Sequence, residues 1–127
     1  MAKKRDQKAF DEAIEKTVEI LMEEVHNRLK KRAWKRAYVE TMWPPSGPGT
    51  GGLQKFRIEL PKGSLISDMF TPIQAALIID EAWRLQKSLF LKTWYGIAVR
   101  FHPNGSYETE YNFDPDCIEN DTTFLDS

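Results

Sequence analysis

Few side chains in this sequence could act as acid–base or nucleophilic groups. There are two histidines, His26 and His102, and one cysteine, Cys117. His26 falls on a polar-flanked helix position and His102 at a turn, so we predict that both are surface histidines. The patterns His-Glu-x-x-His, Cys-x-x-Cys and Gly-x-Ser-x-Gly are absent, which removes the signatures of zinc and serine hydrolases. We therefore predict no catalytic residue, no cofactor and no enzymatic activity.

Two further segments have the composition of ligand-binding loops. The glycine-rich segment 48–52 resembles a phosphate-binding loop, but it lacks the Gly-Lys-Ser/Thr ending and does not open a helix. The carboxylates of Asp114, Asp116, Glu119 and Asp121 would suit calcium, yet the glycine at the bend and the glutamate at loop position 12 are missing. We predict a flexible loop in the first case and no metal site in either.

A basic cluster surrounds the end of the first predicted helix. It consists of Arg28, Lys30, Lys31, Arg32, Lys35 and Arg36. Lysine and arginine neutralise phosphates without regard to base sequence, so this cluster is the best argument for nucleic-acid binding. The alternative is a solvated helix end whose cations complement the helix dipole. The net charge of −1 favours that alternative and makes nucleic acid a less favoured partner.

The C-terminal residues have the opposite charge. Residues 107–127 contain no lysine or arginine and seven acidic residues: Glu108, Glu110, Asp114, Asp116, Glu119, Asp121 and Asp126. One interpretation is a charged sheet edge followed by a solubilising tail at 115–127. The other is a phosphate mimic, a row of carboxylates that occupies the basic cleft of a nuclease and steers association. The residues alone leave both interpretations open.

The segment 94–114 predicts a β-hairpin that positions these carboxylates. His102-Pro-Asn-Gly-Ser106 suits a three-residue loop with a left-handed glycine at Gly105. Pairing His102 with Ser106 then sets hydrophobic and aromatic pairs on one face: Phe101 with Tyr107, Val99 with Thr109, Ile97 with Tyr111, and Tyr95 with Phe113. Glu108 and Glu110 fall on the other face, with Arg100 opposite Glu108 as a structural pair.

The remaining elements follow from periodicity. An apolar stripe predicts a helix over residues 6–32, with Glu12, Glu15, Glu19 and Glu23 on its other faces. Strands are predicted over 34–43 and 53–60, joined by a flexible loop at 44–52. A second helix is predicted from Thr71 as N-cap, with Pro72 at its first position and Gln74 completing a capping box, and with Leu77 and Trp83 buried.

The order α-β-β-α-β-β predicts an α+β fold, in which two helices pack on one face of an antiparallel, roughly four-stranded sheet. Residues 1–127 are expected to form one domain, because 41% hydrophobic and 29% charged residues are ordinary for a globular chain. The single cysteine predicts a cytoplasmic protein. No apolar run approaches 18 residues, so no membrane association is expected.

The C-terminal hairpin also carries a family resemblance. The strand Trp94-Tyr-Gly-Ile97, the Pro-Asn-Gly turn and the strand Tyr107-Glu-Thr-Glu-Tyr-Asn-Phe-Asp114 resemble the closing hairpin of the YezG-like immunity (antitoxin) proteins of bacteria. Residues 34–39, the glycine-rich break and residues 56–60 resemble the earlier strands of that family more loosely. The resemblance covers about half of the chain; the basic first helix and the loop 43–52 are not matched.

The resemblance implies a protein that binds a cognate bacterial toxin, expected to be a cationic nuclease, and neutralises it without chemistry. The toxin-binding residues would be Glu108, Glu110, Asp114 and Asp116, with Tyr111 or the loop residue Trp43 as an aromatic anchor. Two rival hypotheses stay open: a nucleic-acid-associated protein that uses the basic end of the first helix, and a small-molecule enzyme.

Overall fold

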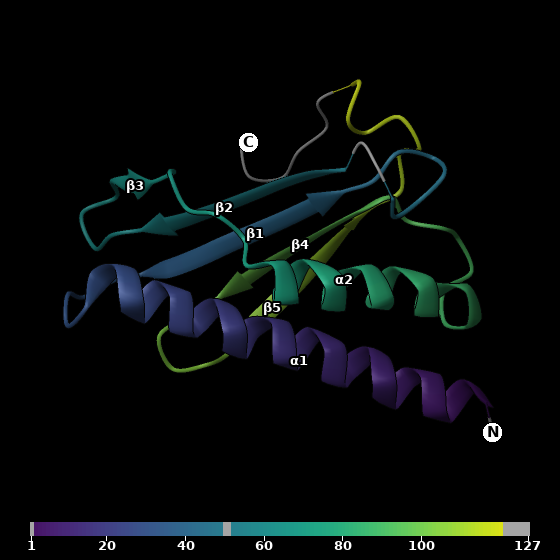
Figure 1. The fold of residues 1–127 in the computed structure, drawn as a ribbon, viewed down its shortest axis with the longest axis horizontal. Helices are drawn as coiled ribbons and strands as arrows, with labels where there is room; N and C mark the ends of the chain where they lie inside the picture. The colour runs from purple at the N-terminus through teal and green to yellow at the C-terminus, as the bar shows by residue number, and fades with distance from the viewer. Residues whose placement is uncertain (1, 50–51, 121–127) are drawn as a thin grey trace.

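The computed structural model describes residues 2–49 and 52–120 and has two layers, helices over a sheet (Figure 1). The chain begins with helix α1 (Ala2–Leu29), followed by strands β1 (Arg36–Met42), β2 (Leu53–Glu59) and β3 (Leu65–Ile66). Helix α2 (Ile73–Leu85) and a short 3₁₀ helix, η1 (Gln86–Ser88), come next. Strands β4 (Gly96–Phe101) and β5 (Tyr107–Asn112) form the C-terminal hairpin.

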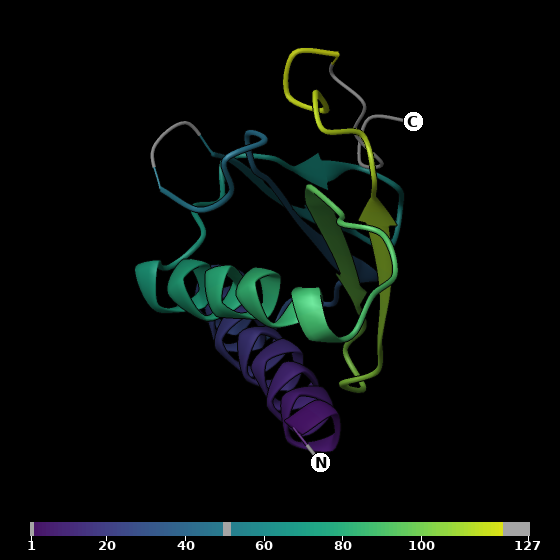
Figure 2. The same ribbon diagram turned by 90° about the vertical axis from the view of Figure 1, so that its right-hand side faces the viewer.

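The sheet is antiparallel, with the strand order β3-β2-β1-β4-β5. Both helices cover the same face, so the predicted α+β architecture is confirmed (Figure 2). The sheet has five strands and not four, because the chain turns at Gly63 (φ +92°) and pairs Ile66 with Ile58. A strand of two residues is too short to show an alternation in the sequence.

Helix α1 follows its predicted apolar stripe. Its buried residues include Phe10, Ile14, Val18, Leu21, Val25 and Leu29. The helix ends at Leu29, three residues before the predicted end, because Lys30 adopts a left-handed conformation (φ +59°). The Lys30 amide donates to the carbonyl of His26 at 2.8 Å and closes the last turn. No helix in the described ranges is long and apolar enough to cross a membrane.

Helix α2 differs from prediction at its start and in its orientation. Pro72 is the N-cap and no side chain caps the helix, so the predicted capping box at Thr71 is wrong. The buried face contains Ala75, Ile79, Ala82 and Trp83, which confirms the burial predicted for Trp83. Leu77 is 62% exposed, so its predicted burial is wrong. The helix is apolar on several sides, and packing against α1 decides which side is buried.

The C-terminal hairpin has the predicted register. Phe101 pairs with Tyr107, Val99 with Thr109 and Ile97 with Tyr111, while Arg100 stands opposite Glu108 and Ala98 opposite Glu110. The turn is closed by a hydrogen bond from the His102 amide to the Ser106 carbonyl at 3.0 Å. Gly105 has φ +89°, a conformation that glycine adopts without strain.

Candidate functional site

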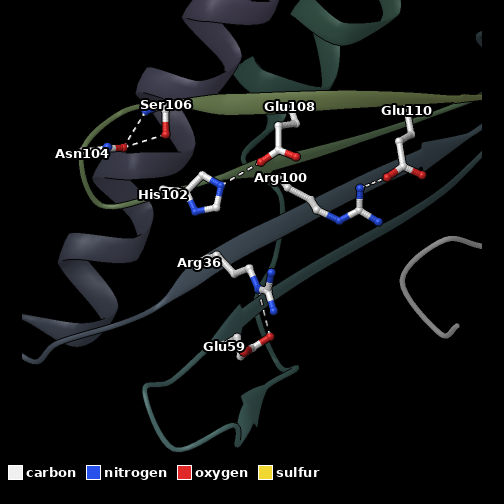
Figure 3. Close-up of polar contacts among 8 residues, drawn as sticks. All are labelled: Arg36, Glu59, Arg100, His102, Asn104, Ser106, Glu108 and Glu110. Atoms are coloured by element: carbon white, nitrogen blue, oxygen red, sulfur yellow. Dashed lines mark hydrogen bonds and ion pairs between the residues drawn. The ribbon is translucent and has the colours of Figure 1, made fainter.

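The predicted site begins on β5, which is an edge strand of the sheet. Residues Tyr107 and Tyr111 of this strand pack toward the helices, as the contact of Tyr111 with Phe90 shows. Because side chains alternate along a strand, Glu108 and Glu110 project from the opposite face, here called the outer face (Figure 3). The outer face therefore carries the predicted carboxylates of β5.

The two β5 carboxylates have partners on β4 and directly after it. Glu110 forms an ion pair with Arg100, and Glu108 Oε1 lies 3.0 Å from His102 Nε2 (Figure 3). The pairing predicted between Arg100 and Glu108 is therefore wrong at the level of side chains, although the backbone register is the predicted one. Arg100 reaches diagonally, since a long side chain spans diagonal neighbours on one face. Glu108 is 67% exposed, whereas the Glu110 side chain is 40% exposed and partly neutralised.

After β5, Asp114 shapes the backbone. Its amide donates to Asn112 Oδ1 at 3.0 Å, and its Oδ1 accepts from the Asp116 amide at 2.9 Å. Its Oδ2 accepts from the Asn120 side-chain amide at 3.0 Å. Asx turns of this kind fix the path of a loop. Asp116 is exposed, and Asp121 and Asp126 lie outside the described residues.

Neither of the predicted aromatic anchors is exposed beside these carboxylates. Tyr111 lies on the helix side of the sheet, where its ring packs against Trp94 at 5.1 Å, and burial raises the pKa of its hydroxyl. Trp43 is only 3% exposed, and its Nε1 donates to Asp80 at 2.9 Å. The expectation that Trp43 is an exposed loop anchor is therefore wrong. The described start of the loop is packed, because Gly47 lies directly against the ring of Trp83.

Glu59 organises a polar cluster on the outer face that the sequence analysis did not single out. Its Oε1 accepts from the Tyr38 hydroxyl at 2.7 Å and from Arg36 Nε at 3.2 Å, and Lys35 Nζ lies 3.2 Å from Oε2. The hydrogen bonds from Tyr38 and then Arg36 lower the pKa of Glu59 from 4.5 to about 2. Arg36 pairs with Glu59 across β1 and β2, a register that no local pattern reveals.

The predicted basic cluster is divided by ion pairs. Arg28 donates to both carboxylate oxygens of Asp68, at 2.9 and 3.1 Å, while Lys35 and Arg36 bind Glu59. Lys30, Lys31 and Arg32 are exposed and form no ion pair within the described part of the chain. Three of the six cations are therefore paired with two carboxylates, Asp68 and Glu59, which lowers the positive charge of this surface without cancelling it.

A second set of carboxylates lies on α1. Asp11, Glu15, Glu19 and Glu23 are spaced four residues apart, which places them in one row along the helix. Glu15 and Asp11 raise the pKa of the Tyr107 hydroxyl after the larger effect of burial, so this row lies beside β5. The spacing was visible in the sequence, but only the tertiary structure shows what it faces.

Within residues 2–49 and 52–120, no three His, Cys, Asp or Glu side chains are placed to hold a metal ion. Cys117 is buried, which raises the pKa of its thiol, and its Sγ lies 3.6 Å from the Tyr95 carbonyl oxygen. No protein-family model matches the chain, and no curated protein matches it significantly.

Proposed function

We propose that this protein is an immunity protein that binds a cationic bacterial toxin, in particular a nuclease, and blocks it by stoichiometric association. The observation that carries the proposal is the acidic stretch on the edge strand and the segment after it. Between Tyr107 and Asn120 it contains five carboxylates and no lysine or arginine: Glu108, Glu110, Asp114, Asp116 and Glu119. We call these five residues the β5 acidic stretch.

The physical basis of the proposal is charge complementarity. A nuclease must hold a polyanion, so its substrate cleft is positive. Exposed carboxylates such as Glu108 and Asp116 attract such a surface and accelerate encounter. Glu110 and Asp114 are engaged in contacts within the chain, and we assign them to shaping the surface more than to binding. An edge strand also leaves one side without a neighbouring strand, which a protein partner can approach.

A protein partner is also supported by an exposed apolar patch at the start of α2. Phe70 and Ile73 are 86% and 78% exposed, and Leu77 lies one turn further along. Contiguous exposed apolar residues are typical of protein contacts and do not suit a phosphate backbone. The ion pairs of Arg28 with Asp68 and of Arg36 with Glu59 reduce the positive charge of the basic cluster, which further weakens the nucleic-acid hypothesis.

The test uses the protein encoded by the reading frame directly upstream, because immunity genes usually follow their toxin genes. Its C-terminal domain is expressed in a bacterial host with and without this protein, and growth is measured. We expect growth inhibition that this protein relieves, and a 1:1 complex in size-exclusion chromatography. A toxic domain that is neither bound nor neutralised, or a domain without toxicity, would contradict the proposal. Salt-sensitive binding of a labelled oligonucleotide by the isolated protein would favour the nucleic-acid hypothesis.

A further inference from the structure

A groove of about 610 Å³ lies between the middle of α1 and the end of the β4–β5 hairpin. The hairpin turn lies beside α1 in both ribbon views (Figures 1 and 2). The groove is lined by Glu15, Val18, Glu19, Met22, Glu23, His26, Gly105 and Tyr107. We call it the α1–β5 groove. Its volume is in the range of sites that hold several side chains or a small ligand.

The groove combines apolar and negatively charged surfaces. Val18, Met22 and Tyr107 are its large apolar or aromatic residues. Glu15, Glu19 and Glu23 are all exposed, and successive members of this row are separated by about 6 Å along the helix axis. Three carboxylates along an apolar groove define a surface that suits a cation with an apolar stem.

These carboxylates are weakly compensated by the protein itself. Glu19 forms an exposed ion pair with Lys16 at 3.4 Å, a type of contact that contributes little. Glu15 and Glu23 form no ion pair with any residue that the structure describes. By contrast, Glu110 of β5 pairs with Arg100 of β4, and Glu108 contacts His102 directly after β4. The α1 wall therefore presents more uncompensated negative charge than the outer face of β5.

We propose, building on the immunity function proposed above, that the α1–β5 groove receives a lysine- or arginine-bearing segment of the toxin. The methylene stems of these side chains pack on Val18, Met22 and Tyr107, and their cationic ends face the glutamates of α1. Lysine and arginine have this division into an apolar stem and a charged end. The cations would then have to recur about every 6 Å, which corresponds to every fourth residue of a helix or every second residue of a strand.

Other classes of occupant fit the groove less well. A nucleic acid would place its phosphates against three carboxylates, which is repulsive. For a metal ion, no three His, Cys, Asp or Glu side chains in residues 2–49 and 52–120 are placed to hold one. An apolar ligand would leave the carboxylates without a counter-charge. A cationic protein segment satisfies the apolar residues and the glutamates together.

The first experiment requires no knowledge of the toxin. The protein is labelled with ¹³C at its methionine methyl groups, of which Met22 lines the groove and Met69 lies at another site. Octalysine amide is titrated at low salt, and an octapeptide of diaminobutyric acid serves as a control with equal charge and shorter stems. We expect octalysine to shift the Met22 methyl resonance saturably and to leave Met69 unchanged, and the short-stem peptide to bind at least about fivefold more weakly.

Two variants with the same change in charge separate the groove from general electrostatics. The groove variant carries Glu15→Gln, Glu19→Gln and Glu23→Gln, and glutamine retains the helix propensity of these exposed positions. The matched control carries Glu108→Gln, Asp116→Asn and Glu119→Gln. We expect the groove variant to lose the Met22 shift and the control to keep it. No Met22 shift in the unmodified protein, or equal losses in both variants, would overturn the groove assignment.

The second experiment measures the same variants against the upstream-encoded toxin domain by surface plasmon resonance. The groove variant should dissociate at least about tenfold faster, because its docking contacts are lost, whereas the control should chiefly associate more slowly. An unchanged dissociation rate of the groove variant would overturn this inference and leave the immunity function standing. Loss of binding in an Ile73→Ser/Leu77→Ser variant would then place the toxin contact on the exposed apolar patch of α2. If the unmodified protein does not bind the toxin, the immunity function fails, and the Met22 titration still decides the groove.

Discussion

Replacement of Glu59 by glutamine should destabilise the protein measurably, although the residue lies on the surface of the sheet. The Glu59 carboxylate accepts hydrogen bonds from the Tyr38 hydroxyl and Arg36 Nε, and it pairs with Lys35 Nζ at 3.2 Å. Glutamine has a similar shape but carries no charge and offers one acceptor oxygen in place of two. The substitution therefore removes the ionic part of the cluster while it preserves the packing.

The magnitude follows from the pKa of Glu59, which falls from 4.5 to about 2 on folding. At about 1.4 kcal/mol for each pKa unit, the full difference would correspond to roughly 3 kcal/mol. Arg36 and Lys35 are substantially exposed, so solvent screens their contribution. We therefore expect Glu59→Gln to lower the free energy of unfolding by about 1–2 kcal/mol at pH 7.

The pH dependence gives this prediction a signature. Because folding lowers the pKa of Glu59, its stabilising contribution is complete above 4.5 and is lost as the pH falls toward about 2. The glutamine variant has no such contribution at any pH. The difference in stability between the unmodified protein and the variant should therefore be largest near neutral pH and shrink steadily through the acidic range.

Urea unfolding, followed by tryptophan fluorescence at pH 7, 5, 4 and 3, measures this difference. Glu108→Gln is the matched control, because Glu108 is also a strand glutamate but is 67% exposed and has only His102 as a partner. We expect the control to change stability by less than about 0.5 kcal/mol. A Glu59→Gln loss no larger than that of the control, or a loss that stays constant down to pH 3, would refute the role assigned to the cluster.

Four further substitutions test the fold. In chemical denaturation, Ile79→Ala should lower the free energy of unfolding by about 2–4 kcal/mol and Leu77→Ala by less than about 0.5 kcal/mol, because Ile79 is buried and Leu77 is exposed. Equal losses would mean that α2 packs through another face. Gly105→Val should cost at least about 1 kcal/mol in thermal melting, since the turn requires φ +89° at this position, and an unchanged melting temperature would contradict that geometry. Gln86→Leu should lower the free energy of unfolding by about 1–3 kcal/mol, because the Gln86 side chain accepts a hydrogen bond from the Trp94 amide at 2.8 Å and donates one to the Trp94 carbonyl at 3.0 Å. Unaltered hydrogen exchange at the Trp94 amide would count against this role.

Local patterns in the sequence were sufficient where neighbouring residues decide the structure. The turn chemistry of His102 to Ser106 and the alternation on both sides of it determine the register of the β4–β5 hairpin, because a shift by one residue would reverse every face. The buried stripe of α1 follows equally from its spacing, since residues three and four apart share one side of a helix. In both cases the relevant partners lie within a few residues or on opposite arms of one turn.

The tertiary structure alone decided which surfaces meet. Leu77 and Ile79 are both large apolar residues, and only the packing of α2 decides that Ile79 is buried and Leu77 is exposed. The diagonal pairing of Arg100 with Glu110 depends on the side-chain reach across two strands. Trp43 is buried among residues distant in the sequence: it packs against the rings of Trp83 and Trp94 and donates to Asp80 of α2.

The same limit applies to the candidate sites. The spacing of Glu15, Glu19 and Glu23 in the sequence predicts that they form one row on a helix, but it does not predict that this row lies beside Tyr107. Periodicity specifies which residues of one element share a face. The element that this face contacts is decided by long-range packing, because the free energy gained there depends on complementary shape and charge from distant parts of the chain.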